Sequence, residues 1–328
     1  MNASDAAVQG DEKIGFVESL PFLFVHLVCL GAIWTGVRPV DIAVCLGLYV
    51  FRMLSLTTGY HRYFAHRTYQ TGRAFQFVLA LLGTLCVQKG PLWWAGHHRH
   101  HHKCSDQPAD IHSPTVRGFW WSHVAWILCA KYERTPVEQI RDFARYPELR
   151  WLNKHYLVPP VLLAVALFLI GGWSMLIWGF FISTVLLWHG TFTINSLSHV
   201  FGRRRYRTED TSRNNWLLAV ITCGEGWHNN HHYHQNTANQ GWFWWEWDPS
   251  YYLLKLLSWA GIIWGVRTPS HAVKYAYRSY SPEERALVRN VPGLFARRSV
   301  ARVKAAGEKV RGALTAATEQ IPVSESTP

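Results

Sequence analysis

The chain has 328 residues, of which 49% are hydrophobic and only 16% are charged, against roughly 25% charged in a typical soluble domain. Its formal net charge is +12, and 15% of its residues are aromatic. This composition excludes a disordered chain and indicates a membrane protein. The six cysteines contain no Cys-x-x-Cys pair, so we interpret them as buried thiols rather than as disulfides, zinc ligands or iron–sulfur ligands.

Four apolar stretches are predicted to cross the membrane as two helical hairpins, at about 21–37, 42–60, 157–170 and 173–194. A membrane-spanning helix needs about 20 mostly apolar residues, and short turns join the members of each pair. Arg52 lies inside the second stretch, which is costly unless its side chain faces protein or reaches the interface. An even number of crossings places both termini and the long segment 61–156 on one side.

The distribution of lysine and arginine predicts which side that is. Of the 33 basic residues, only Arg38 falls in a short loop on the opposite face, so the charged side is predicted to be cytoplasmic. The expected fold is an all-α integral membrane protein, with four transmembrane helices in two hairpins under a cytosolic helical cap formed by 61–156 and 199–268. The expected division is a cytosolic N-terminal segment 1–20, a main domain 21–268 and a basic C-terminal tail 269–328.

Two further apolar stretches are harder to place. Residues 241–266 contain Asp248, Lys255 and a tryptophan cluster, which favour a helix in the membrane interface. The alternative is a fifth crossing, which would put the C-terminal tail outside. Residues 74–92 are interrupted by polar side chains and are also interpreted as an interfacial helix. The acidic N-terminus predicts no cleaved signal peptide.

Histidine is the most unusual feature, because the chain contains 18 of them. Nine lie in four clusters: His61 and His66; His98, His101 and His102; His199; and His228, His231 and His232. Positions i, i+3 and i+4 share one face of a helix, so the members of the second cluster can converge, as can those of the fourth. His61 and His66 are separated by about 140° on an ideal helix. They therefore need a helix end or kink between them, or they serve different metals.

Nine imidazoles suffice for two metal ions, and imidazole suits iron, copper, zinc and nickel. The zinc peptidase pattern His-Glu-x-x-His is absent, and the single Glu-x-x-His, Glu225 to His228, lacks the second copy that soluble di-iron carboxylate proteins use. We interpret Glu225 as orienting an imidazole or a metal-bound water. Nine histidines lie outside the clusters and are interpreted as ordinary residues, although some of them could help to orient the metal ligands. They are His26, His97, His100, His112, His123, His155, His189, His234 and His271.

The histidine clusters and their surroundings resemble those of a known family. The segments HRYFAHR, HRHHHK, NSLSH and GEGWHNNHH resemble the membrane fatty acyl desaturases, and specifically their acyl-CoA (stearoyl-CoA type) Delta-9 branch, over about residues 20–268. The resemblance implies that the nine clustered histidines hold two iron ions, with zinc able to replace iron in purified material. It also implies that Asn195 contacts one metal through water, and that a narrow bent tunnel holds the acyl chain.

The expected reaction consumes dioxygen and two electrons per double bond, because an unactivated methylene needs an oxidant stronger than any side chain. The sequence contains no nucleotide-binding glycine motif, cytochrome b5-like segment or iron–sulfur cysteine pair. A separate donor is therefore expected, such as cytochrome b5 or a ferredoxin with its reductase. Arg99, Lys103, Arg117 and the run Arg203 to Arg205 could hold a CoA or lipid head group, although cytoplasmic topology alone also accounts for basic residues.

Two alternatives stay open at this point. A lipid hydroxylase or ketolase shares the chemistry and differs in the fate of the carbon radical. A histidine-rich metal transporter would also concentrate imidazoles at a membrane, but its ligands should lie near the bilayer midplane, where only His26 and His189 are expected. The sequence does not distinguish three carriers of the acyl chain: coenzyme A, an acyl carrier protein and an intact membrane lipid. No nucleic-acid partner is expected.

Overall fold

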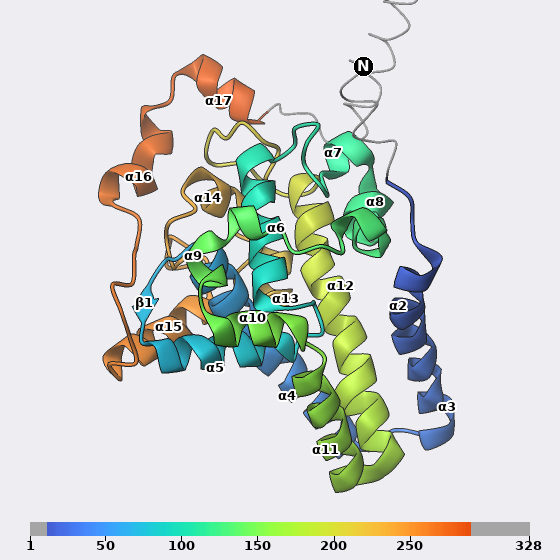
Figure 1. Cartoon of the computed structure of the whole chain (residues 1–328). Helices are drawn as coiled ribbons and strands as arrows, with labels where there is room; N and C mark the ends of the chain where they lie inside the picture. Colours follow the sequence, from blue (N-terminus) through green and yellow to red (C-terminus); the bar gives the residue numbers. More distant parts are fainter. Residues whose placement is uncertain (1–11, 290–328) are drawn as a thin grey trace, which may run out of the picture.

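The computed structural model describes residues 12–289 and is mostly helical (Figure 1). The expectations for residues 1–11, and for the tail from 290 onward, lie outside the described residues. Three helical segments are long and apolar enough to cross a membrane: Phe16–Thr35, Pro39–Ala65 and Val158–His199. The prediction was four crossings, and the third segment accounts for the difference.

The third segment bends back on itself at a glycine. It comprises α11 (Val158–Met175), η6 (Leu176–Ile182), α12 (Ser183–Ser196) and η7 (Leu197–His199). Gly172 has φ 65° and ψ −157°, a conformation that residues with a side chain rarely adopt, so the helix is interrupted and the chain reverses there. α11 packs against η6 beyond the bend, and Figure 1 shows α11 and α12 as the two arms of a hairpin. Two of the expected crossings therefore form one segment of 42 residues.

The first two segments are joined by a short polar turn. The first comprises α2 (Phe16–Val28), η1 (Cys29–Gly31) and α3 (Ala32–Thr35); the second comprises α4 (Pro39–Ser55) and η2 (Leu56–Ala65), a π-helix. Asp41 is fully buried at this turn and accepts hydrogen bonds from the Arg38 backbone N–H at 3.0 Å and from Ser174 Oγ at 2.7 Å. The Asp41 carboxylate therefore caps α4 and connects the turn between the first two segments to α11.

Arg52 has the protein-facing position that its burial requires. Its side chain is fully buried, and the guanidinium donates to Thr184 Oγ1 at 2.8 Å, to Ser183 Oγ and to the Leu85 carbonyl at 3.2 Å. These oxygens satisfy donors that would otherwise be stranded in the bilayer. Arg52 thereby links α4 to the start of α12.

The remaining elements form a cap at one end of these segments. Between the second and third segments lie β1 (Gln70–Thr71), α5 (Arg73–Thr84), α6 (Pro91–Cys104), α7 (Pro114–Arg117), α8 (Phe119–His123), η3 (Ala125–Leu128), η4 (Ala130–Tyr132), η5 (Val137–Gln139), α9 (Arg141–Ala144) and α10 (Pro147–Lys154). After the third segment come α13 (Trp216–Ile221), α14 (His228–Tyr233), α15 (Pro249–Trp259), β2 (Ile263–Trp264), α16 (His271–Tyr275), η8 (Ala276–Ser279) and α17 (Pro282–Arg289).

Two predicted interfacial helices differ from the structure. The helix predicted over 74–92 is wrong in extent, because α5 ends at Thr84 and a turn with positive φ at Val87 and Lys89 precedes α6. In the stretch 241–266, the described structure has the 11-residue helix α15 and the short strand β2 paired with β1, and it contains no spanning helix there. The fifth crossing is therefore not found among the described residues.

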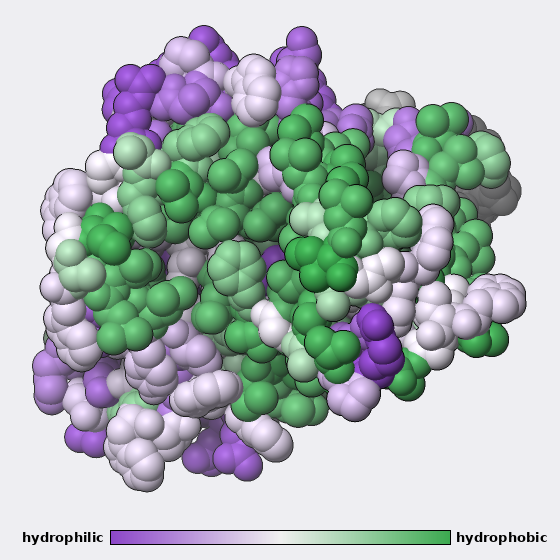
Figure 2. Space-filling view, turned by 90° about the horizontal axis from the view of Figure 1, so that it is seen from below, coloured by the Kyte–Doolittle hydropathy of each residue, from purple (hydrophilic) through white to green (hydrophobic). Residues whose placement is uncertain are grey.

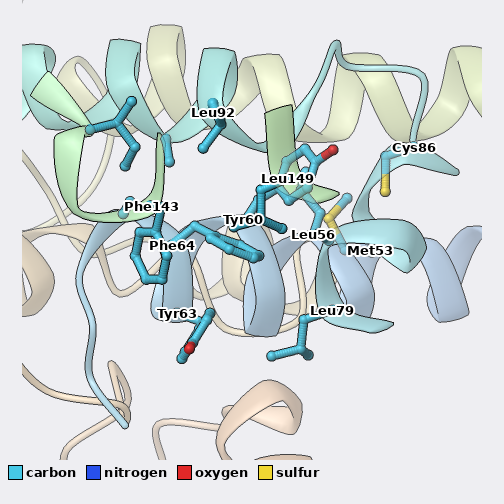
Figure 3. Packing of buried hydrophobic residues seen from close by; sticks show 14 of the residues in the cluster. Met53, Leu56, Tyr60, Tyr63, Phe64, Leu79, Cys86, Leu92, Phe143 and Leu149 are labelled. Atoms are coloured by element: carbon cyan, nitrogen blue, oxygen red, sulfur yellow. The ribbon is translucent and has the colours of Figure 1, made fainter. Parts of the chain in front are cut away.

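The main hydrophobic core joins η2 to the helices that surround it. Figure 3 shows Tyr60 and Phe64 of η2 beside Leu92 of α6, Phe143 of α9 and Leu149 of α10, all of them buried. Figure 2 shows the end of the molecule opposite the cap, seen from below the view of Figure 1. Hydrophobic residues cover much of the middle of this surface, and strongly hydrophilic ones gather toward its edges. The core therefore fixes η2, which carries His61, and α6, which carries His98, His101 and His102. Both lie above the apolar end of the molecule.

Candidate metal centre

Five of the nine predicted histidines form one cluster. Their ligand nitrogens all lie within 4.8 Å of one another, and they come from three separate regions of the chain: His61, His66, His98, His102 and His231. The Nε2 atom of His231 lies 3.1 Å from that of His61 and 3.0 Å from that of His102. The convergence of η2, α6 and α14 thus brings together side chains up to 170 positions apart.

The other four histidines form a second cluster beside the first. The ligand nitrogens of His101, His199, His228 and His232 also lie within 4.8 Å of one another, and the His199 and His228 Nε2 atoms are 3.1 Å apart. His101 and His102 are neighbours on α6 and point into different clusters, as do His231 and His232 on α14. The two clusters therefore share two helices.

The π-helix η2 explains how His61 and His66 enter the same cluster. In a π-helix the backbone hydrogen bond joins residues five apart, and the His66 N–H donates to the His61 carbonyl at 3.1 Å. Their rings lie 4.7 Å apart between centroids. The helix end that the sequence predicted between them is also found, because η2 ends at Ala65 and His66 follows it, while the wider turn places positions i and i+5 on one face.

Four carboxylates hold the outer nitrogens of four of these rings. The Nδ1 atoms of His61, His101, His199 and His232 lie 2.5, 3.0, 3.1 and 2.5 Å from carboxylate oxygens of Glu225, Asp110, Asp106 and Asp210, respectively. A carboxylate beside Nδ1 keeps the proton on that nitrogen, so the lone pair of Nε2 faces the cluster. Glu225 lies beside His61, and its orienting role stays a prediction.

Sequence reasoning missed the three aspartates. Asp106 and Asp110 lie in the loop after α6, and Asp210 lies in the loop before α13, where no periodicity shows which side chains turn inward. Burial alone would raise the pKa of Asp210, but His232 beside it holds that pKa well below its usual range. The carboxylate is therefore ionised and able to fix its imidazole.

Burial sets the protonation state of the cluster histidines. It lowers the pKa of His66, His228 and His231 well below the usual value, and the neighbouring imidazoles lower these values further. These three rings are neutral at neutral pH, which is the form that binds a metal ion. Burial alone would lower the pKa of His199 as well, but Asp106 beside it raises that pKa.

The donor set fits a pair of transition-metal ions. The Nε2 atoms of neighbouring rings face each other at about 3 Å, and a cation at the centre of each cluster would be coordinated by their lone pairs. In the second cluster the buried Nε2 atom of His232 has no hydrogen-bond partner. Four and five nitrogens per cluster leave coordination positions for oxygen ligands.

We expect that replacing Asp210 with Asn will lower the affinity of the second cluster for iron about 10- to 100-fold, because outer carboxylates of this kind raise the basicity of the ligand ring and fix its orientation. The measurement is iron retained per protein after titration with a chelator of known affinity. Glu209→Gln changes the neighbouring exposed side chain in the same way and should retain iron like the wild type. Equal retention in both variants would show that the Asp210 carboxylate does not support the site.

An apolar cavity of about 540 Å³ extends from the membrane-spanning segments to His98 of the first cluster. Its wall includes Phe22, Trp93, Ala164, Phe180, Trp188 and Phe192, and its inner end includes His98, His112 and Asn195. Asn195 is half-buried there, and its backbone carbonyl accepts from Ser122 Oγ at 2.8 Å. A long apolar chain in this cavity would present a methylene near the histidines.

A polar bridge crosses the wall of this cavity near the first cluster. The Trp94 Nε1 donates to Gln88 Oε1 at 3.2 Å, and Gln88 Nε2 donates to Thr191 Oγ1 at 3.1 Å. The Trp94 ring also stacks on His98, with centroids 4.9 Å apart. Gln88 lies in the turn between Val87 and Lys89, both at positive φ, a strained conformation that the surrounding contacts must hold. The bridge therefore fixes the cavity wall relative to the histidines.

The predicted head-group residues are dispersed. Arg99 is paired with Asp142 at 2.8 Å and donates to the Phe64 and Ala65 carbonyls, so it supports η2. Arg117 is paired with Glu12 and donates to the Asp110 carbonyl at 2.9 Å. Lys103 is exposed. None of the three is among the described residues that line the apolar cavity, and their head-group role stays a prediction.

Several histidines outside the nine have more than ordinary surroundings. His112 lies within ligand distance of His101 and Asp110, and it borders the cavity. His26, His189 and His123 form a chain of ring contacts at 3.1 and 3.0 Å that joins α2, α12 and α8. The pattern D-x-H at Asp110 to His112 could have indicated that His112 lies at the metal site. No spacing indicated the contacts among His26, His189 and His123, because these residues lie far apart in sequence.

The fold and the two clusters define a membrane enzyme whose histidine-lined metal centre lies at the head of an apolar cavity. Comparison with known proteins identifies the family. The sequence profile of the fatty acid desaturases matches residues 39–246, and the chain belongs to that family. It is therefore a desaturase, as the histidine clusters predicted.

Three relatives illustrate the range of the similarity. The sn-1 stearoyl-lipid 9-desaturase of Anabaena variabilis is 38% identical over 258 residues, covering 78% of this chain and 94% of the relative. The Delta-9 acyl-lipid desaturase 1 of Arabidopsis thaliana is 37% identical over 267 residues, covering 80% and 86%. The Acyl-CoA 5-desaturase AL21 of Anemone leveillei is 35% identical over 254 residues, covering 76% and 78%. The family assignment is thus confirmed, but not its acyl-CoA branch.

Proposed function

We propose that this protein inserts a cis double bond at the Delta-9 position of a saturated acyl chain carried by a membrane lipid. The observation that carries the proposal is the convergence of two adjoining histidine clusters, the first of which contributes His98 to the lining of an apolar cavity. The names of the Anabaena and Arabidopsis relatives favour an acyl-lipid over the acyl-CoA that the sequence resemblance indicated.

The nine histidines would hold two iron ions, five nitrogens on one and four on the other, and Asn195 would contact one of them through water. Bound iron supplies, with dioxygen, an oxidant able to remove hydrogen from a methylene. The chain's own residues do the rest. The carboxylates of Asp106, Asp110, Asp210 and Glu225 orient four rings, and the cavity excludes water and binds the acyl chain with about 0.8 kcal/mol per buried methylene.

The site of the double bond would follow from geometry. The bridge from Trp94 through Gln88 to Thr191 sets the shape of the cavity beside His98. A chain held with its carboxyl end at the mouth would then present one pair of carbons to the oxidant, and the effective molarity gained by this positioning favours that pair over all others.

We also propose that the membrane is crossed four times, with the cap and both termini in the cytoplasm. Support comes from the reversal at Gly172, which divides Val158–His199 into two arms, and from the concentration of arginine and lysine in the cap. The same division makes 21–268 the desaturase domain and 269–328 a basic tail.

Product analysis of the purified, iron-loaded protein in lipid nanodiscs tests the function. Distearoyl lipid and stearoyl-CoA are supplied in separate reactions with dioxygen, ferredoxin, its reductase and NADPH. We expect loss of two hydrogens at carbons 9 and 10 in the lipid reaction. Desaturation of stearoyl-CoA alone would overturn the acyl-lipid substrate. A gain of oxygen would indicate a hydroxylase, and no reaction on either substrate would contradict the desaturase function.

A further inference from the structure

A second large cavity, of about 880 Å³, lies on the cap and is lined by arginine. It is bounded by the loop that starts at Gly202, by the start of α13 and by the segment from Tyr277 to the end of α17. Six arginines line it: Arg203, Arg204, Arg205, Arg278, Arg285 and Arg289. Such a density of guanidinium groups in a concave surface is a strong attraction for an anionic partner.

Among the residues of 12–289 that line it, one carries a carboxylate, Glu246. It is 1% exposed and already paired with Arg205 at 2.5 Å, so the cavity keeps a large positive excess. Two tryptophans on its rim expose apolar rings to the outside: Trp216 is 69% exposed and Trp245 is 54% exposed. Arginine and tryptophan are the residues most enriched where proteins bind other proteins.

The wall of this cavity adjoins the second histidine cluster. Trp227 lines the cavity and is the residue before His228. Asn214, also in the wall, accepts hydrogen bonds from the Asn229 and Asn230 N–H groups of α14 at 2.9 and 3.1 Å. Covalent and hydrogen bonds therefore connect the cavity surface with the helix that carries three of the nine imidazoles. Electron transfer weakens steeply with distance, and this connection is short.

The cavity's position indicates the kind of partner. α16 and α17 lie at the end of the molecule opposite α3 and the lower end of α11 (Figure 1). In the topology proposed above, this end projects away from the membrane into water. A soluble acidic protein can reach it, whereas a lipid head group lies nearer the plane of the membrane.

We propose that this cavity is the docking site of an acidic one-electron carrier protein, which passes electrons to the metal centre through the wall that contains Trp227. The inference rests on the proposed desaturase function. Two reduced carriers are oxidised in each turnover; their two electrons and two protons from water, with the two hydrogens removed from the acyl chain, reduce one dioxygen to two waters. The carrier's acidic face would pair with the arginines, and its apolar rim with Trp216 and Trp245.

The test compares charge reversals inside and outside the cavity in the full-length, iron-loaded protein in nanodiscs. The double variant Arg203→Glu with Arg289→Glu changes two exposed cavity arginines, and the control Arg150→Glu changes an exposed arginine on α10. The probe is a plant-type [2Fe–2S] ferredoxin. Three quantities are measured: its binding by surface plasmon resonance, kcat/KM for ferredoxin-driven turnover at low salt, and the yield of a single turnover after chemical reduction.

We expect the double variant to lower ferredoxin affinity and kcat/KM about tenfold or more, because opposed charges are replaced by like charges in the encounter. Its single-turnover yield should equal that of the wild type, and Arg150→Glu should change none of the three. Wild-type ferredoxin binding in the double variant would overturn the docking site. So would a selective loss of binding to phosphatidylglycerol vesicles with unchanged ferredoxin turnover. A wild-type protein that binds ferredoxin but forms no product after chemical reduction would instead refute the desaturase function.

Discussion

Replacing His231 with Ala should reduce desaturation about 100-fold or more while leaving the protein folded in the membrane. The His231 Nε2 atom lies within 3.1 Å of the Nε2 atoms of both His61 and His102, so it is central to the five-histidine cluster. Loss of an outer carboxylate alone costs 10- to 100-fold in metal affinity or activity, and loss of a ring that faces the metal should cost more. Replacing His101 with Ala should have the same effect through the other cluster.

The measurement combines iron content by elemental mass spectrometry with product formation by gas chromatography. When both proteins are loaded with iron in the same way, His231→Ala should hold about one metal ion instead of two. His271→Ala removes an exposed histidine outside both clusters and should match the wild type in both readouts. Wild-type turnover with two irons in His231→Ala would remove this residue from the ligand set.

The membrane segments and the histidine clusters follow from local patterns in the sequence. Apolar stretches of spanning length and His-x-x-His-His spacing on α6 and α14 need only helix geometry to be recognised. The pair Gly171 and Gly172 marked the reversal, and Gly172 has non-helical backbone angles there. These features depend on residues close together in the chain.

The features that sequence reasoning missed depend on distant contacts. The helix predicted over 74–92 breaks because the Trp188 ring N–H donates to the Cys86 carbonyl and Arg52 donates to the Leu85 carbonyl, which stabilises a turn that local preference disfavours. Asp106 orients His199, 93 positions away, from a loop without periodicity. The π-turn that unites His61 with His66 likewise has no signature in residue spacing.

The second large effect concerns Arg62, which links the metal centre to the fold. Its guanidinium is 1% exposed and bonds Glu225 at 3.2 Å, Asp248 at 2.9 Å and the Ala238 carbonyl at 2.6 Å. Glu225 in turn holds His61 at 2.5 Å. Arg62→Met would leave two buried carboxylates without their cation, and breaking a buried pair in this way costs about 3–5 kcal/mol. The expected fall in Tm is about 10 °C.

Two comparisons separate this buried network from ordinary surface charge. Arg73 pairs with Glu148 at 2.7 Å on a side chain that is 64% exposed, so Arg73→Met should lower Tm much less than Arg62→Met does. Adding Asp248→Asn to Arg62→Met removes one of the stranded charges, so the double variant should recover part of the lost Tm. Iron content should fall in Arg62→Met, because Glu225 would no longer be fixed beside His61. Equal Tm values for Arg62→Met and Arg73→Met would show that the network contributes nothing to the stability of the cap.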